Sequence, residues 1–132
     1  MLDAVFSSCF LQAQRQDIRV EADITLPDAL PVNEGELAVV LANALENAIN
    51  ANLELPAEER VIRCRVVCVP SLMLEISNPC TGRVAFDDSG RPVSAREGHG
   101  LGVQSISAFC KKHGAVCEYE LNGSWFCLRL VI

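Results

Sequence analysis

The stretch from residue 33 to residue 53 constrains the fold of this chain most, because its apolar residues recur at the spacing of a long helix. Asn33 is followed three residues later by Glu36, the pattern of a capping box, so we predict a helix from about 34 to 53. A helix with one apolar face has to bury that face against a second layer. The apolar face here consists of Leu37, Val40, Leu41, Ala44, Leu45, Ala48 and Ile49.

The rest of the chain supplies that second layer as strands. Alternating or β-rich apolar runs predict strands, and the dipeptide Asn122-Gly123 is a strong hairpin signal. We therefore predict an α/β (α+β) fold, a two-layer sandwich in which a mixed, mostly antiparallel sheet of about five strands carries three helices on one face. The predicted elements are helix 2–16, strand 18–24, helix 34–53, strands 61–69 and 72–77, helix 102–113, and strands 115–121 and 125–131.

Composition limits the class of protein. A chain of 132 residues allows one domain with a core, and half of its residues are apolar, as in a compact folded protein. No apolar run approaches the roughly 20 residues that span a bilayer. The net charge of -6 and the absence of a basic run argue against nucleic acid as a ligand. The odd number of cysteines without a CxxC pair predicts reduced thiols in a cytosolic protein, at Cys9, Cys64, Cys68, Cys80, Cys110, Cys117 and Cys127.

A polar stripe runs along the predicted helix 34–53. Asn43, Asn47 and Asn50 recur at i, i+4 and i+7, beside the apolar face. Asparagine is a poor residue for a helix interior, so three in one stripe need a reason. They form a solvated face, or hydrogen bonds to other helices, or a magnesium site in which one amide oxygen is a sufficient protein ligand. In the last case Glu46 is a candidate to polarise a water or a hydroxyl group.

Two further segments carry candidate ligand contacts. The segment GHGLGVQSI, from Gly98, brings glycines directly before a helix start, where free N–H groups suit an anion; alone it is also an ordinary turn. In ISNPC we expect a strand to end at Asn78 and Pro79 to turn the chain. Asn78 either caps that turn or contacts a base. Between Asn78 and Gly100 the apolar pattern breaks down, which predicts a long mobile loop, and such loops are usually functional.

In this order and at these separations, the three segments resemble the N, G1 and G2 boxes of the gyrase, chaperone, histidine-kinase and MutL ATPase superfamily (GHKL). The resemblance covers nearly the whole chain and implies a Bergerat-type fold. LANALENAINA and the lack of Asp-x-Gly between Ile76 and Cys80 are similar to the quorum-sensing, peptide-responsive (AgrC/LytS-like) branch of histidine kinases.

The resemblance also assigns residue roles. It implies that Asn47 ligates magnesium, that Glu46 is the acid or base, and that Asn43 and Asn50 line the phosphate end. Asn78 takes the place of the aspartate that contacts adenine. Because an amide both accepts and donates, we expect it to distinguish adenine from guanine less well than a carboxylate does. The remaining implied ATP contacts lie at the end of a lid from about 80 to 97 and comprise Gly98, His99, Gly100, Leu101 and Gly102.

The function implied is that of a sensor histidine kinase catalytic domain. It binds Mg·ATP and, in the full-length kinase, transfers the γ-phosphoryl group to a histidine outside this chain. Neither His99 nor His113 resembles that acceptor. The implied partners are ATP, the histidine-bearing dimerisation domain and, indirectly, a response regulator, in a membrane-anchored homodimer whose cytoplasmic part includes this domain. The alternatives are a non-catalytic nucleotide-binding or protein-interaction module with a degenerate GHKL fold, and a serine-kinase or ATPase relative.

Overall fold

The computed structural model describes residues 1–80, 85–86, 92–93 and 99–132, with side chains for residues 1–80 and 104–132. In chain order its elements are α1 (Leu2–Arg15), β1 (Arg19–Ile24), α2 (Glu34–Asn52), a 3-10 helix (Ala57–Glu59), β2 (Val61–Val67), β3 (Met73–Pro79), β4 (Ala85–Phe86), β5 (Pro92–Val93), α3 (His99–His113), β6 (Val116–Asn122) and β7 (Trp125–Val131).

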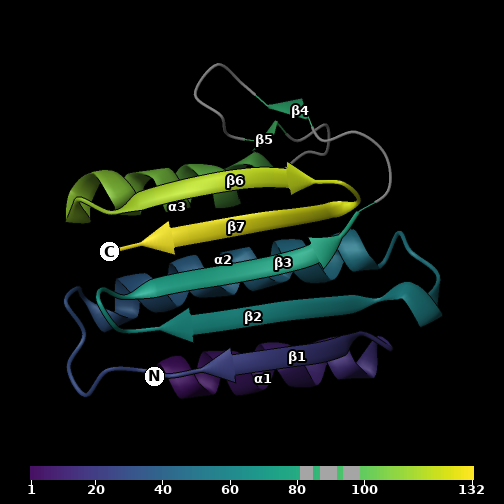
Figure 1. Cartoon of the computed structure of the whole chain (residues 1–132), viewed down its shortest axis with the longest axis horizontal. Helices are drawn as coiled ribbons and strands as arrows, with labels where there is room; N and C mark the ends of the chain where they lie inside the picture. The colour runs from purple at the N-terminus through teal and green to yellow at the C-terminus, as the bar shows by residue number, and fades with distance from the viewer. Residues whose placement is uncertain (81–84, 87–91, 94–98) are drawn as a thin grey trace.

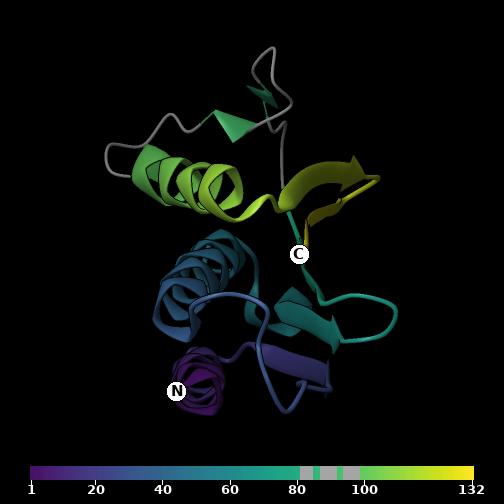
Figure 2. The ribbon, with the colours of Figure 1, turned by 90° about the vertical axis from the view of Figure 1, so that its left-hand side faces the viewer.

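Five of the strands form one sheet in the order β1-β2-β3-β7-β6 (Figure 1). β1 runs parallel to β2, and the other neighbours are antiparallel. The helices α1, α2 and α3 lie on one face of this sheet, as the side view in Figure 2 shows, and the opposite face is open. This arrangement confirms the predicted sandwich with a mixed sheet and three helices on one side.

α2 is the central helix of the helical layer. It contacts both α1 and α3 as well as the sheet beneath it. Every residue of its predicted apolar face is buried, against the inner side chains of the strands. Those strand residues include Ile62, Cys64, Val66, Leu74, Ile76, Leu128 and Leu130. Burial raises the pKa of the Cys64 thiol to about 12, so this cysteine is a neutral core residue, and all seven cysteines are free thiols.

The two ends of α2 are fixed in different ways. At its start the Asn33 side chain accepts a hydrogen bond from the Glu36 backbone N–H at 2.9 Å, which is half of the predicted capping box. The Glu36 carboxylate does not complete the box. It accepts from Lys112 Nζ at 2.6 Å and bonds to His113 Nε2, in the last turn of α3. These bonds lower the pKa of Glu36 and attach the end of α3 to the beginning of α2.

At the end of α2, Asn52 and Arg60 satisfy buried backbone groups. Asn52 is fully buried; its Nδ2 donates to Ala48 O at 2.8 Å and its Oδ1 accepts from Val61 N at 2.9 Å. The Arg60 guanidinium donates to three backbone carbonyl oxygens at and just beyond the ends of α1 and α2, and so it joins these two helix ends. These acceptors are Gln16 O, Asn52 O and Leu55 O, at 2.9, 3.1 and 3.0 Å.

Three element boundaries differ from the sequence prediction in ways that concern the candidate site. β3 does not end at Asn78 but continues through Pro79, which pairs with Trp125. α3 begins at His99 rather than at Gly102. A small pair of antiparallel strands, β4 and β5, lies within the stretch predicted to be an irregular loop. Most of the predicted lid, and Gly98, fall outside the described residues.

Candidate functional site

The asparagine stripe of α2 differs sharply from Asn52 in its hydrogen bonding. Asn43, Asn47 and Asn50 are half-buried, and among the described residues none bonds to their side-chain amides. In the described part of the chain these amides therefore make no hydrogen bonds to other helices, which leaves a solvated face and a ligand site as the two interpretations. Amides that are half-buried and not used by the protein are available to a ligand.

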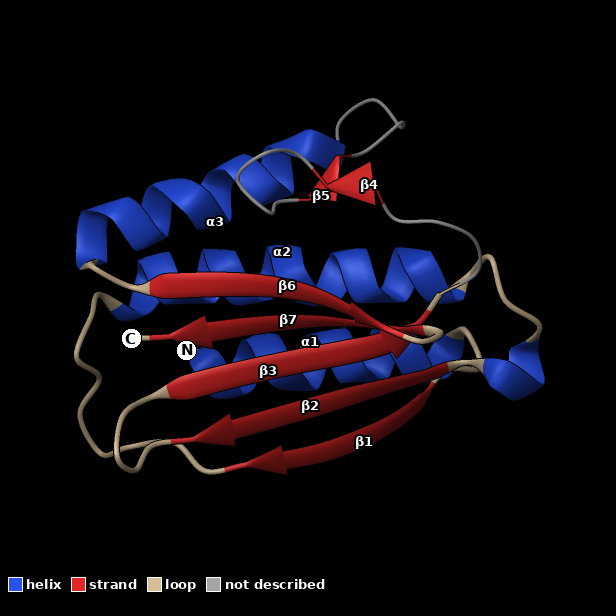
Figure 3. Cartoon of the chain, turned by 45° about the horizontal axis from the view of Figure 1, so that its top comes forward, coloured by secondary structure: helices blue, strands red, loops and turns tan. Residues whose placement is uncertain are grey.

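α3 places its glycine-rich start beside this stripe. The last turn of α3 is bonded to Glu36, and the two helices run antiparallel (Figure 3). Asn47 lies eleven residues after Glu36 in α2, and Gly102 lies eleven residues before His113 in α3. Because both helices rise by about 1.5 Å per residue, the start of α3 lies level with Asn47 and Asn50. His99, Gly100, Leu101 and Gly102 form the first turn of α3, whose backbone N–H groups suit an anion.

Asn78 lies at the same end of the molecule, under the helical layer. In β3 the buried residues alternate, and Asn78 continues the inward row of Leu74 and Ile76 with 3% of its surface exposed. Its Nδ2 donates to Pro79 O at 2.9 Å. This bond fixes the orientation of the amide and leaves Oδ1 and the second N–H of Nδ2 for other groups.

Glu46 occupies the side of α2 that faces α1. Its carboxyl group is exposed, and it lies near enough to Cys9 on α1 to raise the pKa of that thiol, after the larger effect of burial. No residue of α1 belongs to a recognisable motif, so the position of α1 beside Glu46 could not be predicted from the sequence. Among the described residues, no group of three or more His, Cys, Asp or Glu side chains forms a metal site.

Comparison with known families decides what kind of domain this is. The family model described as "GHKL domain" matches residues 32–132, which is most of the chain and includes every candidate site residue. The chain belongs to the GHKL domain family. No protein with a curated description matches the sequence of this GHKL domain.

Solved structures share the fold of this GHKL domain at low sequence identity. The mycobacterial sensor histidine kinase MprB is 20% identical, with a TM-score of 0.71, over 98% of this chain and 93% of that one. The nucleotide-free catalytic domain of the histidine kinase ThkA is 16% identical, with a TM-score of 0.76, over 99% and 88%. The Acinetobacter baumannii histidine kinase AdeS is 20% identical, with a TM-score of 0.73, over 98% and 63%.

The structure thus brings the stripe of α2, Asn78 of β3 and the first turn of α3 to one end of the GHKL domain. His113 lies at the other end of α3, bonded to Glu36 and packed at a tilt against the ring of Phe109. None of the helices in the described part of the chain is long and apolar enough to cross a membrane.

Proposed function

We propose that this GHKL domain binds Mg·ATP at the end of the sandwich formed by α2, β3 and the start of α3. We further propose that in a full-length sensor kinase it transfers the γ-phosphoryl group to a histidine on a separate dimerisation domain. The observation that carries the proposal is the stripe of Asn43, Asn47 and Asn50, whose half-buried amides have no partner among the described residues. The catalytic domains with the same fold belong to proteins named as histidine kinases.

The residues present fit a magnesium ion that is shared with the substrate. Mg²⁺ takes hard oxygen ligands and keeps several waters, so one amide oxygen together with phosphate oxygens completes its shell. Asn47 Oδ1 is the proposed ligand, and when bound the ion neutralises charge on the transferring phosphoryl group. This fits a domain of net charge -6, in which a polyphosphate must be held by local groups.

The other residues position the nucleotide and the attacking group. Asn43 and Asn50 donate from their amides to phosphate oxygens, and the first turn of α3, from His99 to Gly102, offers N–H groups at a helix start. Glu46, exposed on the side of α2 toward α1, is the proposed acceptor of a proton from the incoming nucleophile. The rest of the catalysis is positioning, as in other phosphoryl transfers.

Labelled ATP tests the complete function. The chain alone is expected to bind Mg·ATP and to gain no acid-labile phosphate. Adding the dimerisation domain encoded with it is expected to give acid-labile label on that domain. Binding without any transfer would favour the non-catalytic module, the second candidate, which the presence of Asn78 in place of the family's aspartate supports. Label on His99 or His113 would contradict the proposed division between the two domains.

The cellular context proposed is that of a two-component system. The domain would act in the cytoplasmic part of a membrane-anchored homodimer and supply phosphate, through the dimerisation domain, to a response regulator. The similarity of the asparagine-rich helix to the quorum-sensing branch supports a peptide-responsive kinase as the parent protein.

Asn78 is expected to prefer adenine over guanine. The bond from Nδ2 to Pro79 O fixes the orientation of the amide, and we propose that Oδ1 is the group that faces the base. Oδ1 then accepts from the amino group of adenine and repels the carbonyl of guanine. We expect ATP to bind more tightly than GTP by about 1–3 kcal/mol, and Asn78→Ala to bring the two affinities close together. Calorimetric titration of both proteins with both nucleotides measures this.

Two outcomes check the assignment of Asn78. Asn78→Asp is expected to keep the preference for ATP and to lower the melting temperature, because a carboxylate oxygen would then face Pro79 O. Equal affinity of the unmodified domain for ATP and GTP would show that the base is read elsewhere.

A further inference from the structure

The two edges of the sheet are not equivalent. β1 and β6 are the edge strands, and within the described residues β6 has β7 as its one hydrogen-bonded neighbour. An edge strand presents unpaired backbone groups that can accept another strand unless its side chains prevent this. β6 carries two exposed large apolar side chains, Val116 at 56% and Leu121 at 36%, whereas β1 carries none.

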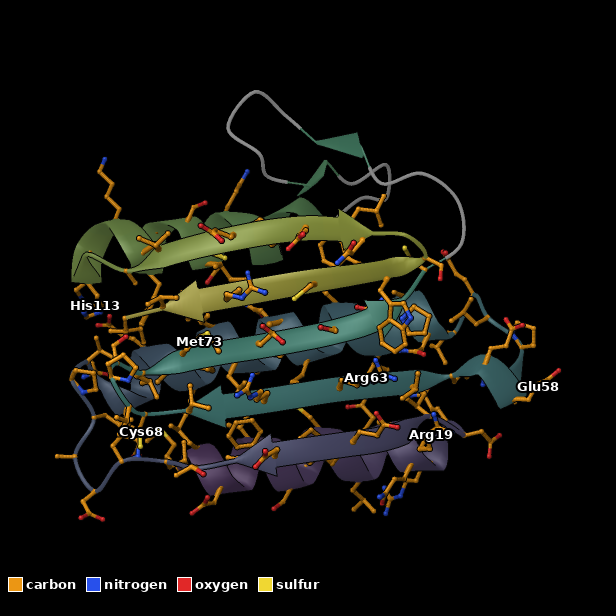
Figure 4. All side chains as sticks on the ribbon, viewed as in Figure 1. Arg19, Glu58, Arg63, Cys68, Met73 and His113 are labelled. Atoms are coloured by element: carbon orange, nitrogen blue, oxygen red, sulfur yellow. The ribbon has the colours of Figure 1, made fainter. Side chains whose placement is uncertain are left out.

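The side chains on the open face of the sheet form rows across the strands, and each row ends at β6. Figure 4 looks onto this face, with Arg63 and Met73 among its residues. The first row alternates in charge and consists of Asp23, Arg65, Glu75, Arg129 and Glu118. The second runs through Glu21, Arg63, Ser77, Cys127 and Glu120. The third is apolar and consists of Val67, Met73, Val131 and Val116.

Ion pairs within these rows show that opposite charges attract across the strands. Arg129 Nε lies 3.0 Å from Glu75 Oε2, and Arg129 Nη1 lies 3.7 Å from Glu118 Oε2. Glu118 is therefore already paired on its inner side, with 66% of its side chain exposed. A strand added on the side of β6 away from β7 would lie opposite Glu118, Glu120 and Val116. These three side chains determine which residues the added strand has to carry on the same face.

We propose that β6 is a docking edge for an extended basic segment of another polypeptide. Directly opposite residues in paired strands contact each other, and opposite charges there are favourable. An added antiparallel strand therefore carries a basic residue opposite Glu120, a second opposite Glu118 and an apolar residue opposite Val116. Read along the partner, this is the pattern basic-x-basic-x-apolar, joined to β6 by backbone hydrogen bonds.

A second copy of this chain does not fit the same edge. Antiparallel pairing of two β6 strands about Tyr119 would set Glu118 of each copy opposite Glu120 of the other. Like charges directly opposite one another destabilise a strand pair. The other edge strand, β1, is less suited to a partner strand whose charged residues are all basic. On its open face basic Arg19 precedes acidic Glu21 and Asp23, so the charges are mixed.

A capped heptapeptide tests the proposal directly. It consists of threonines with arginine at its second and fourth positions and valine at its sixth. We expect it to bind the whole domain, with NMR shifts concentrated at the amides of β6. Glu118→Gln/Glu120→Gln is expected to weaken binding by between about twofold and about 30-fold, as for two cross-strand charge pairs. The matched control is Glu58→Gln/Glu59→Gln, in the exposed 3-10 helix, which makes the same charge change and should leave the affinity unchanged.

A second peptide separates strand pairing from simple attraction to an acidic protein. N-methylation of the amides that would bond to β6 keeps the charges and removes the donors. We expect this peptide not to bind. Equal binding of the methylated peptide, equal weakening by the two double variants, shifts outside β6, or no binding of the original peptide would each overturn the proposal.

Discussion

Asn52→Leu is expected to lower the free energy of unfolding by about 2–4 kcal/mol. The substitution keeps the size of the side chain but removes both amide bonds. It leaves the Val61 N–H, at the start of β2, buried without an acceptor, and this loss is costlier than that of an exposed bond. Urea unfolding followed by circular dichroism measures the change.

The matched control for Asn52 lies two residues away on the same helix. Asn50→Leu removes an amide with no partner among the described residues, so we expect its free energy of unfolding to change by less than about 1 kcal/mol. If Asn52→Leu and Asn50→Leu lowered the free energy of unfolding by similar amounts, Asn52 would not be more important for the fold than Asn50.

Asn47→Ala is expected to weaken Mg·ATP binding by at least about 100-fold. Loss of a residue that merely supports a metal ligand typically costs 10–100-fold in metal affinity, and Asn47 is the proposed ligand itself. The melting temperature should stay nearly unchanged, because no described residue bonds to this amide. Calorimetric titration with ATP, with and without Mg²⁺, measures the effect.

Two controls make this second result specific to the metal. Asn47→Asp keeps an oxygen ligand and should retain binding that depends on Mg²⁺. Without Mg²⁺, the alanine variant and the unmodified domain should bind ATP equally weakly. An alanine variant that binds Mg·ATP as tightly as the unmodified domain would remove Asn47 from the site.

The sequence predicted the layers of the fold because local periodicity decides which face of each element is buried. The apolar face of α2 and the hairpin at Asn122-Gly123 are such local signals, and both are confirmed. Boundaries were less certain. Glycine lowers helix propensity by about 1 kcal/mol per residue, so a start at Gly102 was predicted, whereas the helix begins at His99.

Distant partners explain what the sequence could not predict. Nothing local distinguishes Asn52 from Asn50, because the role of Asn52 depends on Val61, nine residues away. In the same way, Glu36 looks like part of a capping box until α3 brings Lys112 and His113 to it. The bond that orients Asn78 depends on β3 continuing through Pro79, a residue that usually ends a strand.

The attachment of α3 to Glu36 has a mechanical consequence for the whole helix. It fixes α3 at the end remote from the candidate site, so a tilt of α3 is a rotation about its last turn. A helix of 15 residues is about 22 Å long. A rotation of roughly 5° about the Glu36 bonds then displaces the backbone at His99 by about 2 Å, comparable to the helix shifts seen in allosteric transitions. Such a rotation would move the first turn of α3, beside Asn47 and Asn50, further than any other part of the helix.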